Sequence, residues 1–548
     1  MWAWIAAAWA VDAPADPVGD AAAAEIARAL AAVAGRPDAP YFLAVTLTDE
    51  QRVQRIAEDG ALAPHAPQRS RRVDVDVRIG GPTLDSSHAL RTERSDEGAR
   101  TGRALPLDDD PAVLRRVIWR EIDGRLREAE DRWSRVSADR AILVDEHAGP
   151  DLAPRTPAVA DAPWVALTFD PTPWEAPLRS ASAVLAGGVV RDGSAGLWAA
   201  ATHQWFVASD GERVRQGAQS LQIQLRGEAV APDGTVLSLY RSWHARTPDQ
   251  LPTPTEVVDA ATTLAATLEA LVRAPEQPPY NGPVVLSDRA AGVFFHEIFG
   301  HRMEGHRLKR VDNAQTFRDR LHQPILPAFL DVVDDPTLDS WQGTPLRGHY
   351  RYDDEGVAAE RVQLVDDGVL QGFLQSRSPH AEDGRSNGHG RAEPGLKPVS
   401  RQGNLIVTAA NAVTNDALRA QLLAAARAQG QAYALWIDDI QGGFTYTSRG
   451  IPNAFQVDVL LARRVYVDGR PDELVRGIDL IGTPLVAFSR IAAAGESQAV
   501  FNGVCGAESG WVPVSAVAPA LLVSQLETQR KTKGQHQPPL LPPPEVPR

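Results

Sequence analysis

The chain has 548 residues, and its 56 Lys and Arg residues against 70 Asp and Glu residues give a formal net charge of -14. This balance argues against a nucleic-acid partner held by overall charge, because phosphate groups bind to positive surfaces. At roughly 100 to 200 residues per domain, the length predicts about two to four domains. A hydrophobic content of 43% excludes a chain that is disordered throughout.

The single cysteine, Cys505, cannot form an intrachain disulfide, so the fold depends on packing. Residues 1–13 are apolar and contain an Ala-Trp-Ala triplet typical of a cleavage site, but no basic segment precedes it. The N-terminal segment, residues 1–20, is therefore either a signal-peptide remnant or an ordinary start, and both cytoplasmic and exported locations stay open. Elsewhere no run reaches the roughly 18 apolar residues that cross a bilayer, so no membrane span is expected.

Periodic patterns predict an N-terminal domain of mixed helices and strands over residues 21–273. Helices are predicted where apolar residues recur every three or four positions, and strands where they alternate with polar ones. The predicted helices cover residues 21–33, 111–133 and 257–272, and the predicted strands cover residues 73–79, 221–230 and 235–243. The last two strands flank a Pro-Asp-Gly turn, which favours a hairpin. No catalytic pattern stands out in this domain.

A proline-rich linker is predicted at residues 274–283, because its four prolines cannot continue a helix or enter a central strand. Beyond it, a short strand leads through Ser287 and Asp288, both good helix caps, into a helix. Further strands are predicted at residues 361–374, 455–461 and 465–467, and a further helix at residues 416–428. We therefore predict an α+β protein of two domains. Its strand-rich C-terminal domain, residues 284–530, carries the metal-binding helix described next, and a disordered Pro-rich tail follows at residues 531–548.

The sequence HEIFGH at residues 296–301 carries the clearest chemical signal. In the common His-Glu-x-x-His zinc helix, two histidines four residues apart share one face, and the glutamate is the base. Here the spacing is five residues, which corresponds to about 140° around a regular helix and points the rings apart. If His296 and His301 bind one ion, the helix must contain a π-bulge or end near His301. Gly300 makes either distortion inexpensive.

Two histidines do not hold a catalytic metal, so a third ligand is needed. Cys505 is the obvious candidate, because the glycines at positions 503 and 506 allow the backbone to approach a site closely. A plainer interpretation also exists: two histidines on an amphipathic helix are often ordinary residues, and a lone cysteine often packs as a small hydrophobe. The metal hypothesis predicts that the two rings and the Cys505 sulfur converge on one point.

These motifs resemble the TldD/PmbA family of metallopeptidases. The resemblance covers most of residues 283–522 and rests on HEIFGH, on YDDEG at residues 352–356, on SNGHGR at 386–391, and on CG at 505–506 followed by VPV at 512–514. It implies that His296, His301 and Cys505 are metal ligands and that Glu297 is the general base. It also implies zinc, or another divalent metal such as Fe²⁺, a cytoplasmic location, and a homodimer or a heterodimer with a PmbA-like subunit.

Several neighbouring residues have two interpretations each. Asp353, Asp354 and Glu355 could bind metal, although a charged tight turn is the commoner meaning of such a run. Glu304 and His306 could orient a ligand or lie at a solvated helix end. A loop near the cleft is expected to contact the backbone of the substrate through Ser386, Asn387, His389 and Arg391. The family pattern usually continues after the cysteine with Lys and Gln, where this chain has Ala507 and Gly510.

The leading hypothesis is a metal-dependent peptidase that acts on flexible or unfolded polypeptides, because strands that line a cleft can pair with an extended chain. One alternative is a non-catalytic assembly partner, similar to the PmbA (TldE) subunits that lack the ligands. Another is a non-peptidase iron or zinc enzyme, since His/His/Cys ligation fixes neither the metal nor the reaction.

Overall fold

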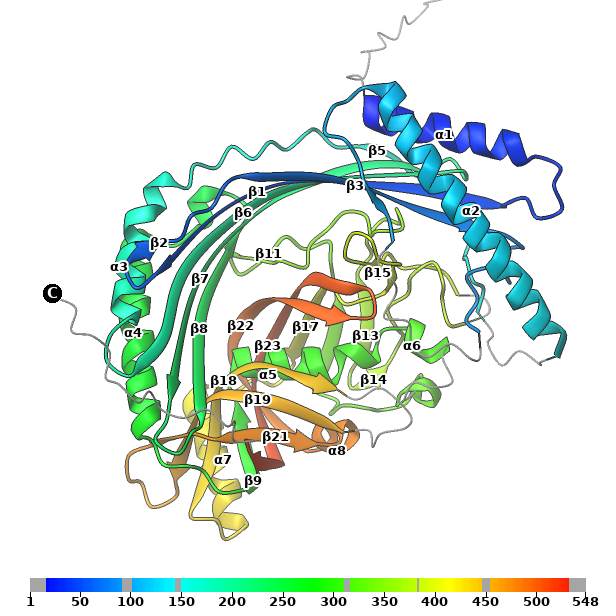
Figure 1. Cartoon of the computed structure of the whole chain (residues 1–548). Helices are drawn as coiled ribbons and strands as arrows, with labels where there is room; N and C mark the ends of the chain where they lie inside the picture. Colours follow the sequence, from blue (N-terminus) through cyan, green and yellow to red (C-terminus); the bar gives the residue numbers. More distant parts are fainter. Residues whose placement is uncertain are drawn as a thin grey trace, which may run out of the picture.

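The computed structural model describes residues 16–90, 101–142, 149–309, 316–381, 384–445 and 454–531. Residues 1–15 of the predicted N-terminal segment (1–20) and residues 532–548 of the predicted Pro-rich tail (531–548) lie outside these ranges. Figure 1 shows a long curved sheet from the N-terminal half that arches over a second, strand-rich body formed by the C-terminal half. The predicted mixture of helices and strands is therefore confirmed, and no helix in the described ranges is long and apolar enough to cross a membrane.

The arch is an eight-stranded sheet over the described residues, in the order β4-β3-β1-β6-β7-β5, with β2 paired to β1 and β8 paired to β7. Its long strands alternate, so that one side chain faces the outer helices and the next faces inward. On β3, for example, Val73, Val75 and Val77 are buried against the helices. The strands are β1 (Phe42–Glu58), β2 (Ala61–Leu62), β3 (Gln68–Arg78), β4 (Arg103–Ala104), β5 (Val159–Asp161), β6 (Val190–Ala208), β7 (Arg213–Val230) and β8 (Val236–Ala245).

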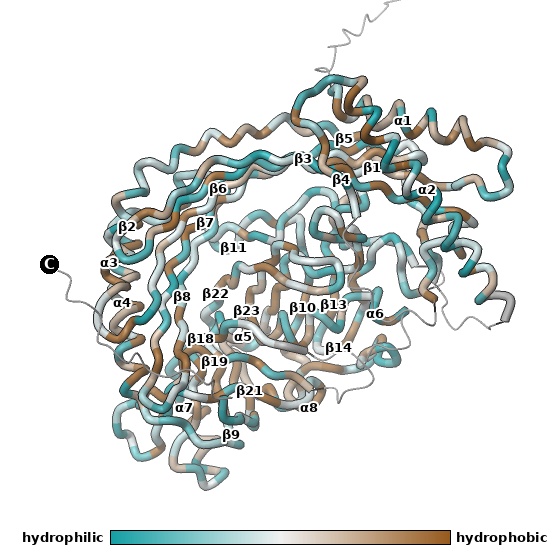
Figure 2. Tube along the Cα trace, in the orientation of Figure 1, coloured by the Kyte–Doolittle hydropathy of each residue, from teal (hydrophilic) through white to brown (hydrophobic). Residues whose placement is uncertain are grey.

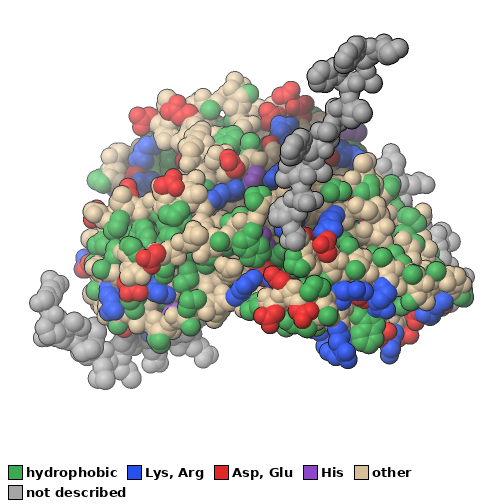
Figure 3. Space-filling view, turned by 90° about the horizontal axis from the view of Figure 1, so that it is seen from above, with side chains coloured by type: hydrophobic (Ala, Val, Ile, Leu, Met, Phe, Trp, Pro, Cys, Tyr) green, Lys and Arg blue, Asp and Glu red, His purple; other side chains and the backbone are tan. Residues whose placement is uncertain are grey.

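Two helix pairs cover the outer side of the arch (Figure 1). Helices α1 (Pro17–Val33) and α2 (Pro111–Ile142) pack on β1 and β3, whereas α3 (Glu175–Leu185) and α4 (Pro254–Arg273) pack on β6, β7 and β8. Thr253 begins α4 with a capping box, in which its side chain and that of Glu256 satisfy backbone N–H groups reciprocally. On the face seen from above, charged side chains of both signs are interspersed with hydrophobic ones (Figure 3).

The C-terminal body contains a ring of strands. β9 pairs with both β18 and β23, and β21 and β19 close the ring between β23 and β18. The sheet continues from β23 through β17, β10 and β13 to β14, and β22 pairs with β23 as a long hairpin. The strands are β9 (Asn281–Leu286), β10 (Leu330–Asp334), β13 (Val362–Asp366), β14 (Val369–Leu370), β17 (Asn404–Ala409), β18 (Tyr433–Thr445), β19 (Phe455–Tyr466), β20 (Glu473–Val475), β21 (Ile478–Gly482), β22 (Ile491–Ala507) and β23 (Gly510–Arg530).

Short strand pairs and helices complete the body. The strand pairs are β11 (Ser340–Trp341) with β12 (Thr344–Pro345) and β15 (Gly390–Arg391) with β16 (Val399–Ser400). The helices are α5 (Asp288–Ile298), α6 (His306–Lys309), α7 (Asn415–Ala428) and α8 (Pro484–Ser489). Figure 2 shows that hydrophobic residues concentrate on the strands of this body, such as β17 and β23, and that hydrophilic residues dominate the connections between them.

Helix α5 is the central element of the C-terminal core. Ser287 caps it as predicted, because its side chain accepts a hydrogen bond from the Ala290 N–H. Gly292 allows close approach to β23, since a Cβ there would lie 3.2 Å from the Ala516 carbonyl oxygen. Phe294 and Phe295 are fully buried and pack against Phe455 and Phe488. The N-terminal end of α5 is thus fixed before the histidines begin.

Most predicted elements form, with shifted limits. The first helix begins at Pro17, and the second extends to Ile142. The strands predicted at residues 455–461 and 465–467 are one strand, β19. The arginines between them did not end the strand, because Arg463 pairs with Asp438 and Arg464 pairs with Glu473 at its surface. The first sheet ends with β8 and the second begins with β9 at Asn281, so residues 281–283 of the predicted linker are part of the second sheet, and residues 274–280 precede it.

Phe294 provides a test of this core. Replacing it with alanine should lower the free energy of unfolding by about 3 to 5 kcal/mol, because the change leaves a cavity among four packed rings. The matched control is Leu485→Ala on α8, where the side chain is 38% exposed and the change should stay within about 0.5 kcal/mol. Urea unfolding monitored by tryptophan fluorescence measures both. Equal stability losses in the two variants would contradict this packing.

Candidate metal centre

The two histidines of the HEIFGH motif lie on either side of a helix end. Helix α5 ends at Ile298, and a 3₁₀ turn, Gly300–Arg302, follows at once. Of the two predicted distortions the structure uses the helix end, and the rings of His296 and His301 approach to a centroid distance of 5.3 Å. Gly300 leaves room for the buried Gln402 side chain, because a Cβ there would lie 1.8 Å from Oε1 of Gln402.

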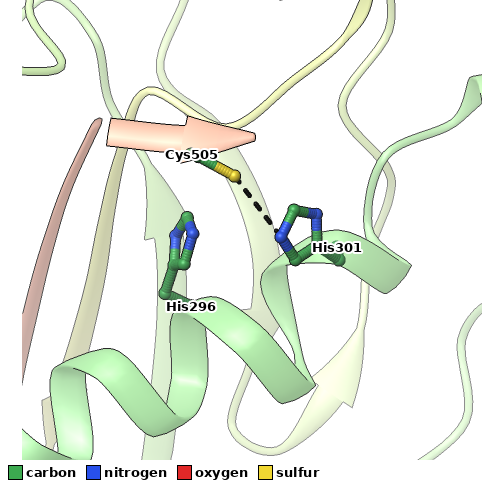
Figure 4. A group of neighbouring side chains, drawn as sticks. All are labelled: His296, His301 and Cys505. Carbon is green, nitrogen blue, oxygen red and sulfur yellow. Dashed lines mark hydrogen bonds between the residues drawn. The ribbon is translucent and has the colours of Figure 1, made fainter. Parts of the chain in front are cut away.

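The long β22–β23 hairpin brings the cysteine to the histidines. Cys505 pairs with Val512 across the hairpin and is buried with Val512 and Val514. Its Sγ atom lies 3.3 Å from Nε2 of His301, and one ligand atom from each of His296, His301 and Cys505 lies within 4.8 Å of the others. Figure 4 shows the three side chains pointing toward one another from the helix end and the strand.

This arrangement fits a metal ion. Tetrahedral zinc with two nitrogen ligands and one sulfur ligand holds these atoms roughly 3.3 to 3.7 Å apart, so small rotamer changes suffice. Nδ1 of His296 is buried without a hydrogen-bond partner among the described groups. Such an orphaned nitrogen is costly unless something binds it. The donor set, two imidazoles and one thiol, suits zinc and other borderline divalent metals.

The charges of the three side chains favour a thiolate on Cys505 beside protonated rings of His296 and His301. Burial opposes ionisation of Cys505, but the neighbouring His301, His296 and Arg401 hold the pKa of the thiol well below its usual range. Burial likewise opposes the charged form of His301, yet Cys505 and Glu304 raise the pKa of this imidazole well above its ordinary value. A thiolate is the form of cysteine that binds metal.

Glu297 lies at the open side of the cluster. Its side chain is 15% exposed, more than that of His301, and its Oε2 lies 3.9 Å from His301 Nε2. Burial raises the pKa of Glu297, although His296 and His301 act in the opposite direction. The glycines of β18 leave space beside it: a Cβ on Gly443 would lie 3.4 Å from the Glu297 side chain. A partly accessible carboxylate next to the ligand atoms suits proton transfer.

A buried ionic network supports the cluster from behind. Glu304 is fully buried, and its Oε2 accepts hydrogen bonds from His301 Nδ1 at 3.2 Å and from Arg307 Nε at 2.9 Å. Arg401 is also fully buried, with its Nε 3.4 Å from Glu304 Oε1. The guanidinium of Arg401 donates a 2.6 Å hydrogen bond to the Cys505 carbonyl oxygen. One ion pair therefore contacts both arms of the cluster.

Sequence reasoning did not find Arg401, and it left the role of Glu304 open between ligand orientation and a solvated helix end. The structure buries Glu304 against a candidate ligand. His306 lies 3.7 Å from Glu508, which also pairs with Arg307, so it is one contact further from the cluster. No local pattern marks Arg401, because its partners come from other parts of the chain.

The acidic run at residues 353–355 forms a turn, but the turn is buried rather than solvated. Asp353 accepts hydrogen bonds from the N–H groups of Glu355, Val357 and Gly390. Asp354 accepts one from the side chain of Gln204 on the arch. Burial raises the pKa of Asp353 well above its ordinary value, and the nearby Glu355 adds to the rise. This turn joins the arch to the C-terminal body.

The loop predicted to contact substrate is largely engaged in internal bonds. Ser386 donates to the Gln375 carbonyl oxygen, the Asn387 side chain bonds to Gln375 and Phe373, and His389 Nε2 lies 3.2 Å from Asp334. Arg391 donates to two carbonyl oxygens and also lines the large cavity under the arch. The other three predicted residues are not among the described residues that line this cavity. A substrate contact at these positions stays a prediction.

The cavity under the arch has a volume of about 1360 Å³. Its walls are the inner face of the arch and loops of the C-terminal body, together with Val504 and Trp511 of the β22–β23 hairpin. Neighbouring residues on a strand point to opposite faces, so Val504 faces the cavity while Cys505 faces the histidines. The candidate ligands do not belong to the described lining, although Val512, which pairs with Cys505 across the hairpin, does.

Comparison with known proteins gives a consistent result. Residues 279–530 match the model of the PmbA/TldA metallopeptidase C-terminal domain. The chain is 29% identical over 267 residues to a metalloprotease of Archaeoglobus fulgidus, covering 48% of this chain and 57% of that protein. It is 25% identical over 247 residues to a zinc metalloprotease TldD homolog of Saccharolobus solfataricus, covering 45% and 51%. The chain thus spans about half the length of the curated relatives it matches.

Among solved structures, TldE from Thermococcus kodakarensis has a similar fold, with a TM-score of 0.60 at 12% identity over 89% of this chain and 97% of that one. At this identity the likeness concerns the fold alone, and it extends over both the arch and the C-terminal body. The C-terminal domain, residues 279–530, therefore matches the TldD/PmbA family, and the whole chain shares the fold of a TldE structure.

Proposed function

We propose that this protein is a metal-dependent peptidase whose ion, zinc or another divalent metal such as Fe²⁺, is held by His296, His301 and Cys505. The observation that carries the proposal is the convergence of these three buried side chains, from a helix end and a separate hairpin, within 4.8 Å. When bound, the ion supplies Lewis-acid polarisation of the scissile carbonyl. The relatives' names, metalloprotease and zinc metalloprotease, agree with this chemistry.

The chain's own residues supply the proton transfers. Glu297 Oε2, beside His301, takes a proton from the attacking water and passes it to the leaving amine nitrogen. The raised pKa of its carboxyl suits both steps, because a base that must later act as an acid works best near the operating pH. Glu304 holds the His301 ring through Nδ1, so that Nε2 points toward the ligand cluster.

An extended polypeptide is the proposed substrate, because β18 offers an edge beside Glu297. β18 pairs with β9 only at residues 435–437, and Gly442 and Gly443 follow without side chains. A substrate strand running past these glycines could pair with the main chain while its scissile bond lies near the cluster. Binding through main-chain groups tolerates many sequences, as the cleavage of flexible polypeptides requires.

The alternatives are less well supported. A non-catalytic assembly partner needs no ligand set, whereas this chain keeps both histidines, the cysteine and a glutamate next to them. A non-peptidase iron or zinc enzyme stays compatible with the ligands, and the peptidase assay below separates the two. Assembly as a homodimer or with a PmbA-like subunit remains part of the proposal, as does a cytoplasmic location.

The Glu297→Gln variant should keep its metal and lose hydrolysis. The amide preserves the shape but cannot accept the proton, so turnover of an unfolded protein should fall about 10²- to 10⁴-fold. Metal content by elemental analysis and cleavage of a denatured protein, each with and without chelator, measure the two properties. Normal turnover by the variant would falsify the base assignment, and chelator-resistant cleavage would exclude the metal mechanism.

The Cys505→Ala variant should bind metal far more weakly. The variant removes the only thiolate of the cluster. Loss of a hydrogen-bond partner of a ligand lowers metal affinity roughly 10- to 100-fold, and we expect loss of the ligand itself to lower it further. Dialysis against a weak chelator followed by metal analysis checks this. Stoichiometry equal to that of the parent protein would mean that another residue is the third ligand.

The Glu304→Gln variant tests the supporting network. Loss of the carboxylate should weaken metal binding about 10- to 100-fold by releasing the His301 ring. Cobalt substitution gives a second readout, since the visible absorption of Co²⁺ reports ligand geometry whether or not the protein is active. Glu360→Gln, which removes a surface pair with Arg385, is the control. A cobalt spectrum and affinity unchanged by Glu304→Gln would contradict this role.

A further inference from the structure

Two arginines that line the large cavity under the arch form no ion pair with any residue that the structure describes. Arg246 follows the end of β8, and Arg347 follows β12 in the C-terminal body; both are half-buried and both line the cavity. The Arg246 guanidinium donates to the Leu346 carbonyl oxygen at 2.8 Å, which places the Arg246 side chain beside the main chain that leads into Arg347. Within the described residues, neither arginine forms an ion pair.

Two other arginines of the same cavity have acidic partners, whereas Arg72, Arg391 and Lys397 also line it without an ion pair among the described residues. Arg78 pairs with Asp76 at 2.8 Å and also lies 3.4 Å from Asp85, and Arg377 lies 3.4 Å from Asp210. Removing an arginine from water without a counter-charge is costly, which explains these pairs. Arg246 and Arg347 are half-buried at the cavity wall without an ion pair among the described residues, so each is a candidate to bind an anion.

The surroundings of the two arginines are basic rather than acidic. His244 and His349 flank them, and both histidines have lowered pKa values, chiefly through burial and then through the nearby Arg347 and Arg246 respectively. Burial also lowers the pKa of Arg347 to about 10, and no carboxylate opposes this shift. The single acid that acts on Arg246 is Asp339, which is exposed. At neutral pH the positive charge is that of the arginines.

We propose that Arg246 and Arg347 form a carboxylate-binding subsite for an acidic segment of a polypeptide that enters the cavity. A guanidinium binds a carboxylate through two parallel hydrogen bonds, and a partly dehydrated cavity strengthens the attraction. The cavity, at about 1360 Å³, exceeds the roughly 300 to 1,000 Å³ of ordinary small-molecule sites. It has room for a chain segment as well as for a single anionic group.

The rest of the lining favours polypeptide over nucleic acid. The inner face of the arch presents hydroxyl and amide side chains that can bond to peptide groups, such as Thr46, Thr202 and Gln222. Trp511, 62% exposed, and Val504, 47% exposed, offer an apolar surface on the hairpin. Acidic side chains elsewhere in the lining, among them Asp74 and Asp76, would repel a continuous phosphate backbone.

The subsite is linked to the hairpin of the metal centre. The N–H of Arg347 donates to Asn502 Oδ1 at 3.0 Å and to Ser515 Oγ at 2.8 Å. Asn502 is three residues from Cys505, which is about 10 Å along an extended strand. A polypeptide held here would lie on the opposite face of the hairpin from the ligands, as a bound extension of the substrate. The subsite rests on the proposed function in one respect, namely that its ligand is a polypeptide.

Binding of three labelled peptides of equal length tests the subsite separately from cleavage. The peptides differ only in carrying Glu, Gln or Lys at their variable positions, and the protein is the full chain with Glu297→Gln, which prevents turnover. Fluorescence anisotropy should show the Glu peptide binding at least about tenfold more tightly than the Gln peptide, with the difference shrinking as salt rises. Arg347→Gln should remove the preference, and Arg347→Glu should reverse it in favour of the Lys peptide.

The control and the opposing outcomes are specific. Arg127→Gln removes an equal charge from the exposed surface of α2 and should leave the preference intact. Thermal unfolding verifies that each variant is folded, and Arg246→Gln provides an independent probe if Arg347→Glu is not. The subsite is refuted if the parent binds no acidic peptide, if it binds the Glu and Gln peptides equally, or if the preference survives both neutral substitutions. Tighter binding of a single-stranded oligonucleotide than of the Glu peptide would also overturn it. Absence of cleavage by the parent chain with a preserved Glu preference would count against the peptidase and not against the subsite.

Discussion

Segments that are remote in sequence meet at the buried carboxylate of Glu304. It bonds to the ring of His301 on one side and to Arg307 on the other, and Arg401 links it to the backbone of Cys505. Burial opposes the ionised form, but His301 and the two arginines hold the pKa of this carboxyl far below its ordinary value. Because removal of one partner leaves an uncompensated buried charge, the helix end and the hairpin cannot move independently. The geometry of the candidate ligands follows from this constraint.

The β22–β23 hairpin gives the protein two separate environments. Its inner face is apolar around Cys505, where Val512 and Val514 exclude water. Its outer face, at Val504 and Trp511, belongs to the cavity under the arch, which also contains Arg246 and Arg347. A single two-stranded layer thus divides the region proposed for bond cleavage from a region suited to holding chain. Two-residue alternation alone achieves this division, without an additional domain.

Local patterns in the sequence predict much of the C-terminal body, because its signals are short-range. Ser287 caps α5 as expected, and the five-residue histidine spacing forces the helix to end where Gly300 permits. The arch was harder to foresee. On β6 the consecutive Ala199, Ala200 and Ala201 remove the contrast between the two faces, so the alternation that marks a strand is lost. Arg401 and Arg347 contact partners that lie about a hundred or more residues away, and no local pattern encodes such contacts.

The construction of the arch separates two kinds of residue. On β1, Val45 and Leu47 belong to the core under the helices, whereas the half-buried Thr46 and Glu50 line the cavity. Changes on the inner face therefore alter the shape and polarity of the cavity with little effect on folding stability, because the buried side chains remain the same. The residues on the inner face of the sheet can therefore change while its core stays the same. Ligand preference can diverge among related chains, or be redesigned, one position at a time while the fold is retained.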